Sequence, residues 1–199
     1  MRVLCACEES QAVTVAFRNR GHEAFSCDLV PCSGGHPEWH IQDNVLNHLS
    51  DGWDMLIGFP PCTYFSRAGS CRLYRNGTID QERLQLVYQY RDFFYSLWES
   101  DIDKICLENP VPMSVAALPF YSQVIQPFQF GHPFTKQTCL WLKNLPILMA
   151  TDIVVPVGSW VGSPNERELQ SSLYSGGNRT SRRSKTFPGV ALAMADQWG

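Results

Sequence analysis

Long hydrophobic runs are missing from this sequence of 199 residues. No stretch approaches the roughly 18 apolar residues that a membrane-spanning helix needs, which argues against a membrane protein of that type. An apolar signal segment is also missing, because the N-terminus becomes acidic at Glu8 and Glu9. We therefore expect a cytoplasmic protein with no membrane partner.

Positive charge is scarce as well. The chain has 16 Lys and Arg against 19 Asp and Glu, which gives a formal net charge of −3. Indiscriminate binding to nucleic acid depends on many contacts between basic side chains and phosphate, so this balance argues against it. A groove with local positive charge is still compatible with the composition.

The apolar content is sufficient for one hydrophobic core. Hydrophobic residues make up 44% and charged residues 18%, which excludes a largely disordered chain. The length predicts a single domain over residues 1–199. The eight cysteines come without an export signal, so we expect reduced thiols that act as buried side chains, metal ligands or a nucleophile.

Short apolar runs alternate with helical periodicity, a pattern typical of an α/β domain with a mainly parallel sheet. The runs that predict strands are residues 3–5, 24–27, 55–57, 105–107 and 138–142. Helical spacing covers residues 10–19, 79–100 and 190–198, with a short helical turn at 45–49. Residues 30–40 and 63–78 are expected to be loops.

Polar or reactive side chains follow four of the predicted strands. In open parallel sheets, ligands bind at the carboxyl ends of the strands. The four clusters are residues 7–10, Asp28, Cys62 and Glu108. We expect these loops to converge on one crevice.

Two of the clusters point to chemistry. Pro60 and Pro61 restrict the backbone before Cys62, which holds a thiol rigidly at a strand exit; the alternative is a turn followed by a buried cysteine. Glu108 ends a later strand, where a carboxylate is often a helix cap or a solvated residue. Together, a thiolate nucleophile and a carboxyl hydrogen-bonding partner can act on one heterocycle.

These residues carry a resemblance to a known family. Gly58-Phe59-Pro60-Pro61-Cys62 with Ser66, and Glu108-Asn109-Pro110, resemble the two catalytic motifs of the DNA cytosine-5 methyltransferases. The chain is also similar to a compact, phage-type branch of site-specific DNA methylases, over roughly residues 1–147 and from about Arg182 onward. The segments that carry this second similarity are Ala6-Cys7-Glu8, Gly21-His22-Glu23-Ala24, Cys27-Asp28-Leu29 and Gly131-His132-Pro133.

The resemblance implies a fold and a mechanism. The fold would be Rossmann-like, with helices on both faces of the sheet. The Cys62 thiolate would attack C6 of a cytosine while Glu108 hydrogen-bonds N3, and C5 would take a methyl group from S-adenosylmethionine. Pro61, Ser66 and Asn109 would lie on the substrate side. In duplex DNA the base must first leave the stack, which costs a few kcal/mol.

The resemblance also implies a cofactor site. It would comprise the turn after the first strand (Ala6, Cys7, Glu8, Glu9 and Ser10) with Asp28, Leu29, Asp43 and Pro60. Glu8 or Glu9 would meet the methionine ammonium, Asp28 the ribose hydroxyls, Leu29 the adenine ring and Asp43 its exocyclic amine. The family's glycine-rich turn is missing, because the first glycine is Gly21. The alternative for Asp43 is a helix N-cap ahead of residues 45–49.

Nucleic acid, double- or single-stranded DNA, is the partner that the resemblance implies. Lys136 lies where the family carries a Gln-x-Arg-x-Arg motif beside the flipped base; the alternative is a solvated lysine. Residues 146–185 stand in place of the usual recognition domain and hold Trp160 and Tyr174 among basic residues, of which we assign Arg179, Arg182 and Arg183 to substrate. The alternative is a solvated linker.

Other interpretations stay open. Cys27, Cys32, His36 and His40 have spacing within the loose range of a zinc site, although independent burial of Cys27 is the simpler expectation, and we assign no metal. The chain could also be a catalytically weak relative that binds DNA or cofactor as a regulator or decoy. A third hypothesis is an enzyme that modifies cytosine in RNA or in a free nucleotide.

Overall fold

A seven-stranded sheet organises the chain, with strand order β3-β2-β1-β4-β7-β10-β8. The computed structural model describes residues 1–75, 77–161, 168 and 183–199. Five strands are parallel: β1 (Arg2–Ala6), β2 (Glu23–Asp28), β3 (His40–Gln42), β4 (Met55–Gly58) and β7 (Lys104–Asn109). The other two strands are β10 (Thr138–Lys143), antiparallel to β7, and β8 (Gln123–Ile125), antiparallel to β10. This mixed, mostly parallel sheet confirms the expected Rossmann-like α/β fold.

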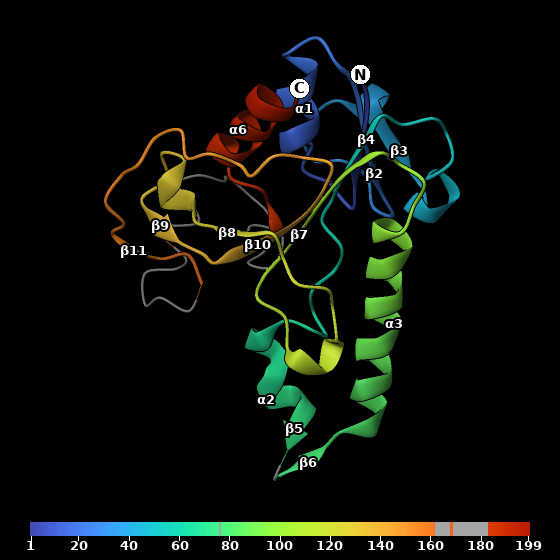
Figure 1. Cartoon of the computed structure of the whole chain (residues 1–199), viewed down its shortest axis with the longest axis vertical. Coiled ribbons are helices and arrows are strands. Elements are labelled where there is room, and N and C mark those ends of the chain that lie inside the picture. The colour runs from blue at the N-terminus through green and yellow to red at the C-terminus, as the bar shows by residue number, and fades with distance from the viewer. Residues whose placement is uncertain (76, 162–167, 169–182) are drawn as a thin grey trace.

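Helices cover both faces of the sheet, as Figure 1 shows. On one face, α1 (Ala12–Arg18) and α6 (Pro188–Trp198) share a core with Val3 and Cys5 of β1. On the other, α3 (Gln81–Trp98) contributes Phe94 and Leu97 to a core with Leu4 and Ala6. Successive β1 residues thus enter opposite cores, as the period of two in a strand requires. None of the described helices is both long and apolar enough to cross a membrane.

The predicted loop at residues 63–78 contains regular structure, which corrects that expectation. It holds α2 (Ser70–Leu73) and a hairpin of β5 (Tyr74–Arg75) with β6 (Thr78–Ile79). Buried Phe65 and Leu73 pack there against Val87 of α3, and these few apolar anchors give too little periodicity to predict. Because Ile79 pairs in β6, α3 begins at Gln81, with Asp80 as its side-chain cap.

The remaining elements are short. Residues 30–40, expected as loop, end in the 3₁₀ helix Pro37–Trp39, and β3 follows. Other 3₁₀ turns lie at Val45–Asn47, Arg67–Gly69, Ser114–Ala116 and Pro127–Gln129, and β9 (Phe134–Thr135) pairs with β11 (Gly158–Ser159).

The carboxyl ends of four adjacent strands form one edge of the sheet. Ala6 of β1 pairs with Cys27 of β2 and with Gly58 of β4, and Gly58 pairs with Leu107 of β7. A Cβ atom at Gly58 would lie 2.7 Å from Leu107 Cδ2, so this position admits only glycine without a shift. The loops that follow these strands therefore leave the sheet side by side, as predicted.

Candidate active site

Cys62 and Glu108 line one cavity, at the edge where β4 and β7 end. The cavity encloses about 400 Å³. Its walls also contain Pro60, Pro61 and Asn109, with Lys136 and residues 183–186 beside them. The structure thus brings together the thiol and the carboxyl group that the sequence placed at separate strand ends.

The backbone before Cys62 is anchored to β7. The Asn109 side chain is 1% exposed, and its Nδ2 donates to the Pro60 carbonyl at 2.8 Å. On the other side of the thiol, the Ser66 N–H donates to the Cys62 carbonyl at 3.0 Å. The loop that carries Cys62 is therefore tied to the strand that carries Glu108.

Burial dominates the electrostatics of the two reactive groups. It raises the pKa of the Cys62 thiol, and the charge of Glu108 raises it further, while Lys136 and Arg183 act in the opposite direction. Burial likewise raises the pKa of Glu108, against the charge of Lys136 and a hydrogen bond from Thr138. A carboxyl group with a raised pKa can hold the proton that a hydrogen bond to a ring nitrogen requires.

The turn after β1 forms without glycine. Cys7 and Gln11 both have φ of 58°, in the left-handed region that usually costs other residues about 1–2 kcal/mol each. Hydrogen bonds hold both positions: the Cys7 N–H donates to the Cys27 carbonyl at 2.7 Å, and the Gln11 side chain exchanges two bonds with the His36 backbone at 2.8 and 3.1 Å. Tertiary contacts thus hold both residues in this conformation without glycine.

Gly34 packs directly against this turn. A Cβ atom there would lie 2.5 Å from Gln11 Cβ and 2.6 Å from the Ser10 carbonyl. The loop after β2 therefore braces the turn from outside, and Ser33 adds an N–H bond to the Glu9 carbonyl at 2.8 Å.

Glu8 supports the turn from inside. Its side chain is 3% exposed, and its carboxylate accepts from the Val13 N–H at 2.6 Å and from the Thr14 N–H and hydroxyl at 3.2 and 2.7 Å. The two N–H groups are backbone donors that lack a partner within the first turn of α1. Burial nevertheless raises the pKa of Glu8 to about 7. The Glu8 carboxylate is thus bonded to α1, and Glu8, Glu9 and Ser10 all line this wall of the first cavity.

A second cavity of about 290 Å³ adjoins the first. Cys7, Asp28 and Pro61 line both. The second cavity is otherwise mostly apolar, with Leu29, Asp43, Asn44, Val45 and three residues of α3 in its walls. Asp28 and Asp43 therefore face the same space beside the exit of β1, as predicted.

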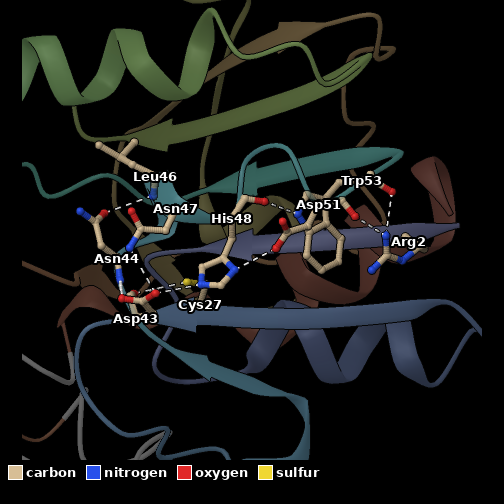
Figure 2. Close-up of polar contacts among 10 residues, drawn as sticks. Arg2, Cys27, Asp43, Asn44, Leu46, Asn47, His48, Asp51 and Trp53 are labelled. Carbon is tan, nitrogen blue, oxygen red and sulfur yellow. Dashed lines mark hydrogen bonds and ion pairs between the residues drawn. The ribbon is translucent and has the colours of Figure 1, made fainter.

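A hydrogen-bond network fixes the Asp43 carboxylate (Figure 2). It accepts from the Asn44 N–H at 2.7 Å and from Asn47 Nδ2 at 3.2 Å, and it contacts His48 Nε2 at 3.1 Å. The bond from Asn44 is the main reason that the pKa of Asp43 is lowered. The N-cap of the turn Val45–Asn47 is Asn44 and not Asp43, because the Asn44 side chain accepts from the Leu46 N–H. Asp43 therefore presents a preoriented negative charge.

His48 holds this network together. Its Nδ1 lies 2.8 Å from Asp51 Oδ2, and this bond is the largest cause that raises the pKa of His48. Asp51 and Asp43 thus hold the ring on two sides, and the His48 carbonyl accepts from Trp53 Nε1 at 2.7 Å, which anchors the main chain.

The substrate residues predicted from the sequence differ in whether they line a cavity. Lys136 is half-buried and lines the cavity, with Nζ donating to the Arg183 carbonyl at 3.2 Å, so it is not a solvated surface lysine. Ser66 is buried, pairs with Pro112, and does not line either cavity. Ala6 is fully buried in β1 and contributes no lining side chain.

The expectation for residues 146–185 can be followed only in part. Arg179, Arg182 and Tyr174 lie outside the described residues, whereas Arg183 lines the first cavity. Trp160 is fully buried and packs against Phe134 and Phe187, at centroid distances of 4.9 and 4.8 Å. Trp160 therefore belongs to the core and does not offer a ring to a nucleic-acid base, which corrects that prediction.

The four candidate zinc ligands do not come together. Among the described residues, no group of three or more His, Cys, Asp or Glu side chains is arranged to hold a metal ion. His40 contacts the Ser26 hydroxyl at 2.8 Å and the Val30 carbonyl at 2.9 Å. The His36 ring stacks on Trp39, 4.0 Å between centroids.

Several lining residues escaped the sequence analysis. Gln89, Tyr90 and Phe93 of α3 form one wall of the second cavity, and Ser184 and Thr186 line the first. The α3 residues lie inside an amphipathic helix, where an aromatic side chain predicts core packing. The sequence contains no local signal that separates the two roles.

Comparison with known proteins defines the fold. No protein-family model matches the sequence, and no curated protein does. Among solved structures, the methyltransferase EhMeth of Entamoeba histolytica aligns with a TM-score of 0.50 at 11% identity, over 91% of this chain and 62% of its own. A mutant DNMT2 of Spodoptera frugiperda aligns with a TM-score of 0.43 at 13% identity, over 90% of this chain and 61% of its own. The chain thus spans about three fifths of the length of each, and with EhMeth it shares a Rossmann-like methyltransferase fold.

Proposed function

We propose that this protein is an S-adenosylmethionine-dependent methyltransferase that acts on C5 of cytosine in DNA, in the cytoplasm. The observation that carries the proposal is the meeting of Cys62 and Glu108 in one cavity, next to a second cavity that contains Asp28 and Asp43. A thiol and a carboxyl group in one pocket suit attack on a heterocycle that is held at a ring nitrogen.

The residues of the second cavity fit an adenosine group. Its walls are mostly apolar, as a purine ring requires, and Asp28 and Asp43 offer acceptors for ribose hydroxyls and an exocyclic amine. Asp28 is shared with the catalytic cavity, so a ligand in the second cavity would reach towards Cys62 past Pro61. Glu8, Glu9 and Ser10 line the first cavity at this wall and are the candidates to meet the ammonium end.

The chain's own residues would act in sequence. Cys62, after loss of its proton, forms a bond from sulfur to C6 of the cytosine while Glu108 holds N3 by a hydrogen bond, and electron density moves to C5. When bound, S-adenosylmethionine supplies the electrophilic methyl group to that carbon. Loss of the C5 proton to a base then expels the Cys62 sulfur and restores the aromatic ring. Lys136 and Arg183 favour the thiolate, since both oppose the raised pKa of Cys62.

The target base must enter the cavity alone, because a stacked base does not expose its ring to a thiol. Base flipping therefore belongs to the proposal, at a cost of a few kcal/mol in duplex DNA. Lys136 and Arg183 border the cavity and offer positive charge to a phosphate backbone.

Mass spectrometry of nucleosides tests this proposal. DNA and RNA from cells that express the wild-type protein are digested, with the Cys62→Ala protein as control. We expect 5-methylcytosine in DNA that depends on Cys62. 5-Methylcytosine in RNA alone would mean that RNA, not DNA, is the substrate. Absence of 5-methylcytosine from both polymers, together with no affinity for the cofactor, would favour a catalytically weak relative that binds DNA.

A further inference from the structure

Among the contacts that anchor the loop around Cys62, two lie on either side of the thiol. Before the thiol, Asn109 of β7 holds the Pro60 carbonyl. After the thiol, Tyr64 lies against α3, where its ring packs on Tyr90 at 4.7 Å between centroids with an angle of 52°. The second anchor is the one that the mechanism above does not use.

Arg83 of α3 secures this second anchor. Its guanidinium carbon lies 4.9 Å from the centre of the Tyr64 ring, and its Nη2 donates to the Thr63 carbonyl at 3.3 Å. Tyr64 is thus held between a cation and an aromatic ring of the same helix. Cys62, Tyr64 and Tyr90 all pack against one small apolar cluster around Phe65.

Tyr90 also lines the second cavity, together with Phe93. Pro61, which directly precedes the nucleophile, lines that cavity as well. A ligand in the second cavity would therefore restrict Tyr90 and Pro61 on one side, and through them Tyr64 and Cys62 on the other.

We infer that Tyr64 is a positioning residue for Cys62, and that its ring contact with Tyr90 couples occupancy of the cofactor cavity to the placement of the nucleophile. The inference rests on the proposed function, since the occupant is taken to be an adenosine-containing cofactor. With the cavity filled, the Tyr64–Tyr90 contact holds the thiol inside the catalytic cavity. With the cavity empty, the loop around Cys62 is freer to expose it.

Alkylation of Cys62 by iodoacetamide, followed by peptide mass spectrometry, tests this coupling with S-adenosylhomocysteine as the probe. We expect saturating probe to slow alkylation at least about fivefold in the wild type, the lower end of ordinary coupling between sites. Tyr64→Phe keeps the ring and should keep this protection. Tyr64→Leu removes the ring and should lose most of it, whereas Tyr74→Leu, at an exposed tyrosine of the same segment, should behave as wild type.

The remaining outcomes are separable. Equal protection in all variants means direct shielding by the probe and overturns the inference alone, as does loss of protection in Tyr74→Leu. Absence of calorimetric binding of S-adenosylhomocysteine to the wild type overturns the proposed cofactor site and the inference together. If Tyr64→Leu does not fold, Tyr90→Leu breaks the same ring contact from α3, and protection at a probe concentration that saturates this variant overturns the inference.

Discussion

Glu8 gives the molecule a pH-dependent stability that can be worked out from the structure. The ordinary pKa of 4.5 becomes about 7 because the side chain is buried, despite three hydrogen bonds from α1. At about 1.4 kcal/mol for each tenfold change in proton affinity, this difference corresponds to about 3 kcal/mol. The raised pKa means that the folded chain binds this proton more tightly than the unfolded chain. The free energy of unfolding therefore falls as pH rises from about 4.5 to about 7 and levels off above that.

Glu8→Gln removes this titration and keeps the shape of the side chain. Urea unfolding at pH 5, 6, 7 and 8 should show that the wild type loses about 2–3 kcal/mol across this range relative to the variant, since part of the loss occurs below pH 5. The comparison is needed because Glu108 also has a raised pKa, and its contribution is common to both proteins. Glu99→Gln, at an exposed glutamate, controls for the loss of one negative charge. Parallel pH profiles of wild type and Glu8→Gln would refute the reasoning.

Two further predictions concern the cavities. Asp28→Ala should weaken binding of S-adenosylmethionine about 10- to 150-fold, since a hydrogen bond to a charged group contributes about 1.5–3 kcal/mol; calorimetry measures it, with exposed Asp92→Ala as control, and unchanged affinity would mean that the ribose lies elsewhere. Lys136→Met should shift the pH profile of Cys62 alkylation to higher pH, because the Lys136 charge lowers the pKa of that thiol. An unshifted profile would remove Lys136 from the site.

The parallel strands could be predicted because their signal is local. Buried strands such as residues 55–57 are short, continuously apolar and followed by turn residues, which is sufficient to identify them. The strand-end rule then placed Cys62 and Glu108 at one edge, and the structure brings both into one cavity. The order of the sheet depends on long-range pairing, so the antiparallel direction of β10 had no signature in the sequence.

The features that the sequence did not reveal share a physical cause, since each depends on a partner distant in sequence or in space. The residue type of Glu8 does not indicate that it caps α1, and only the fold shows Val13 and Thr14 as its donors. Trp160 lies among polar and basic neighbours in sequence, yet Phe134 and Phe187 bury its ring. Local composition therefore describes the surroundings of such residues poorly.

The central claim is that Cys62 forms the covalent bond to cytosine, and trapping tests it most directly. DNA that contains 5-fluorocytosine is incubated with the protein and S-adenosylmethionine, and covalent complexes are separated under denaturing conditions and mapped by peptide mass spectrometry. Fluorine at C5 prevents the final proton removal, so the adduct should persist on Cys62. We predict trapping by the wild type and by Cys71→Ser, and none by Cys62→Ser. Trapping by Cys62→Ser, or a complex mapped to another residue, would contradict the account.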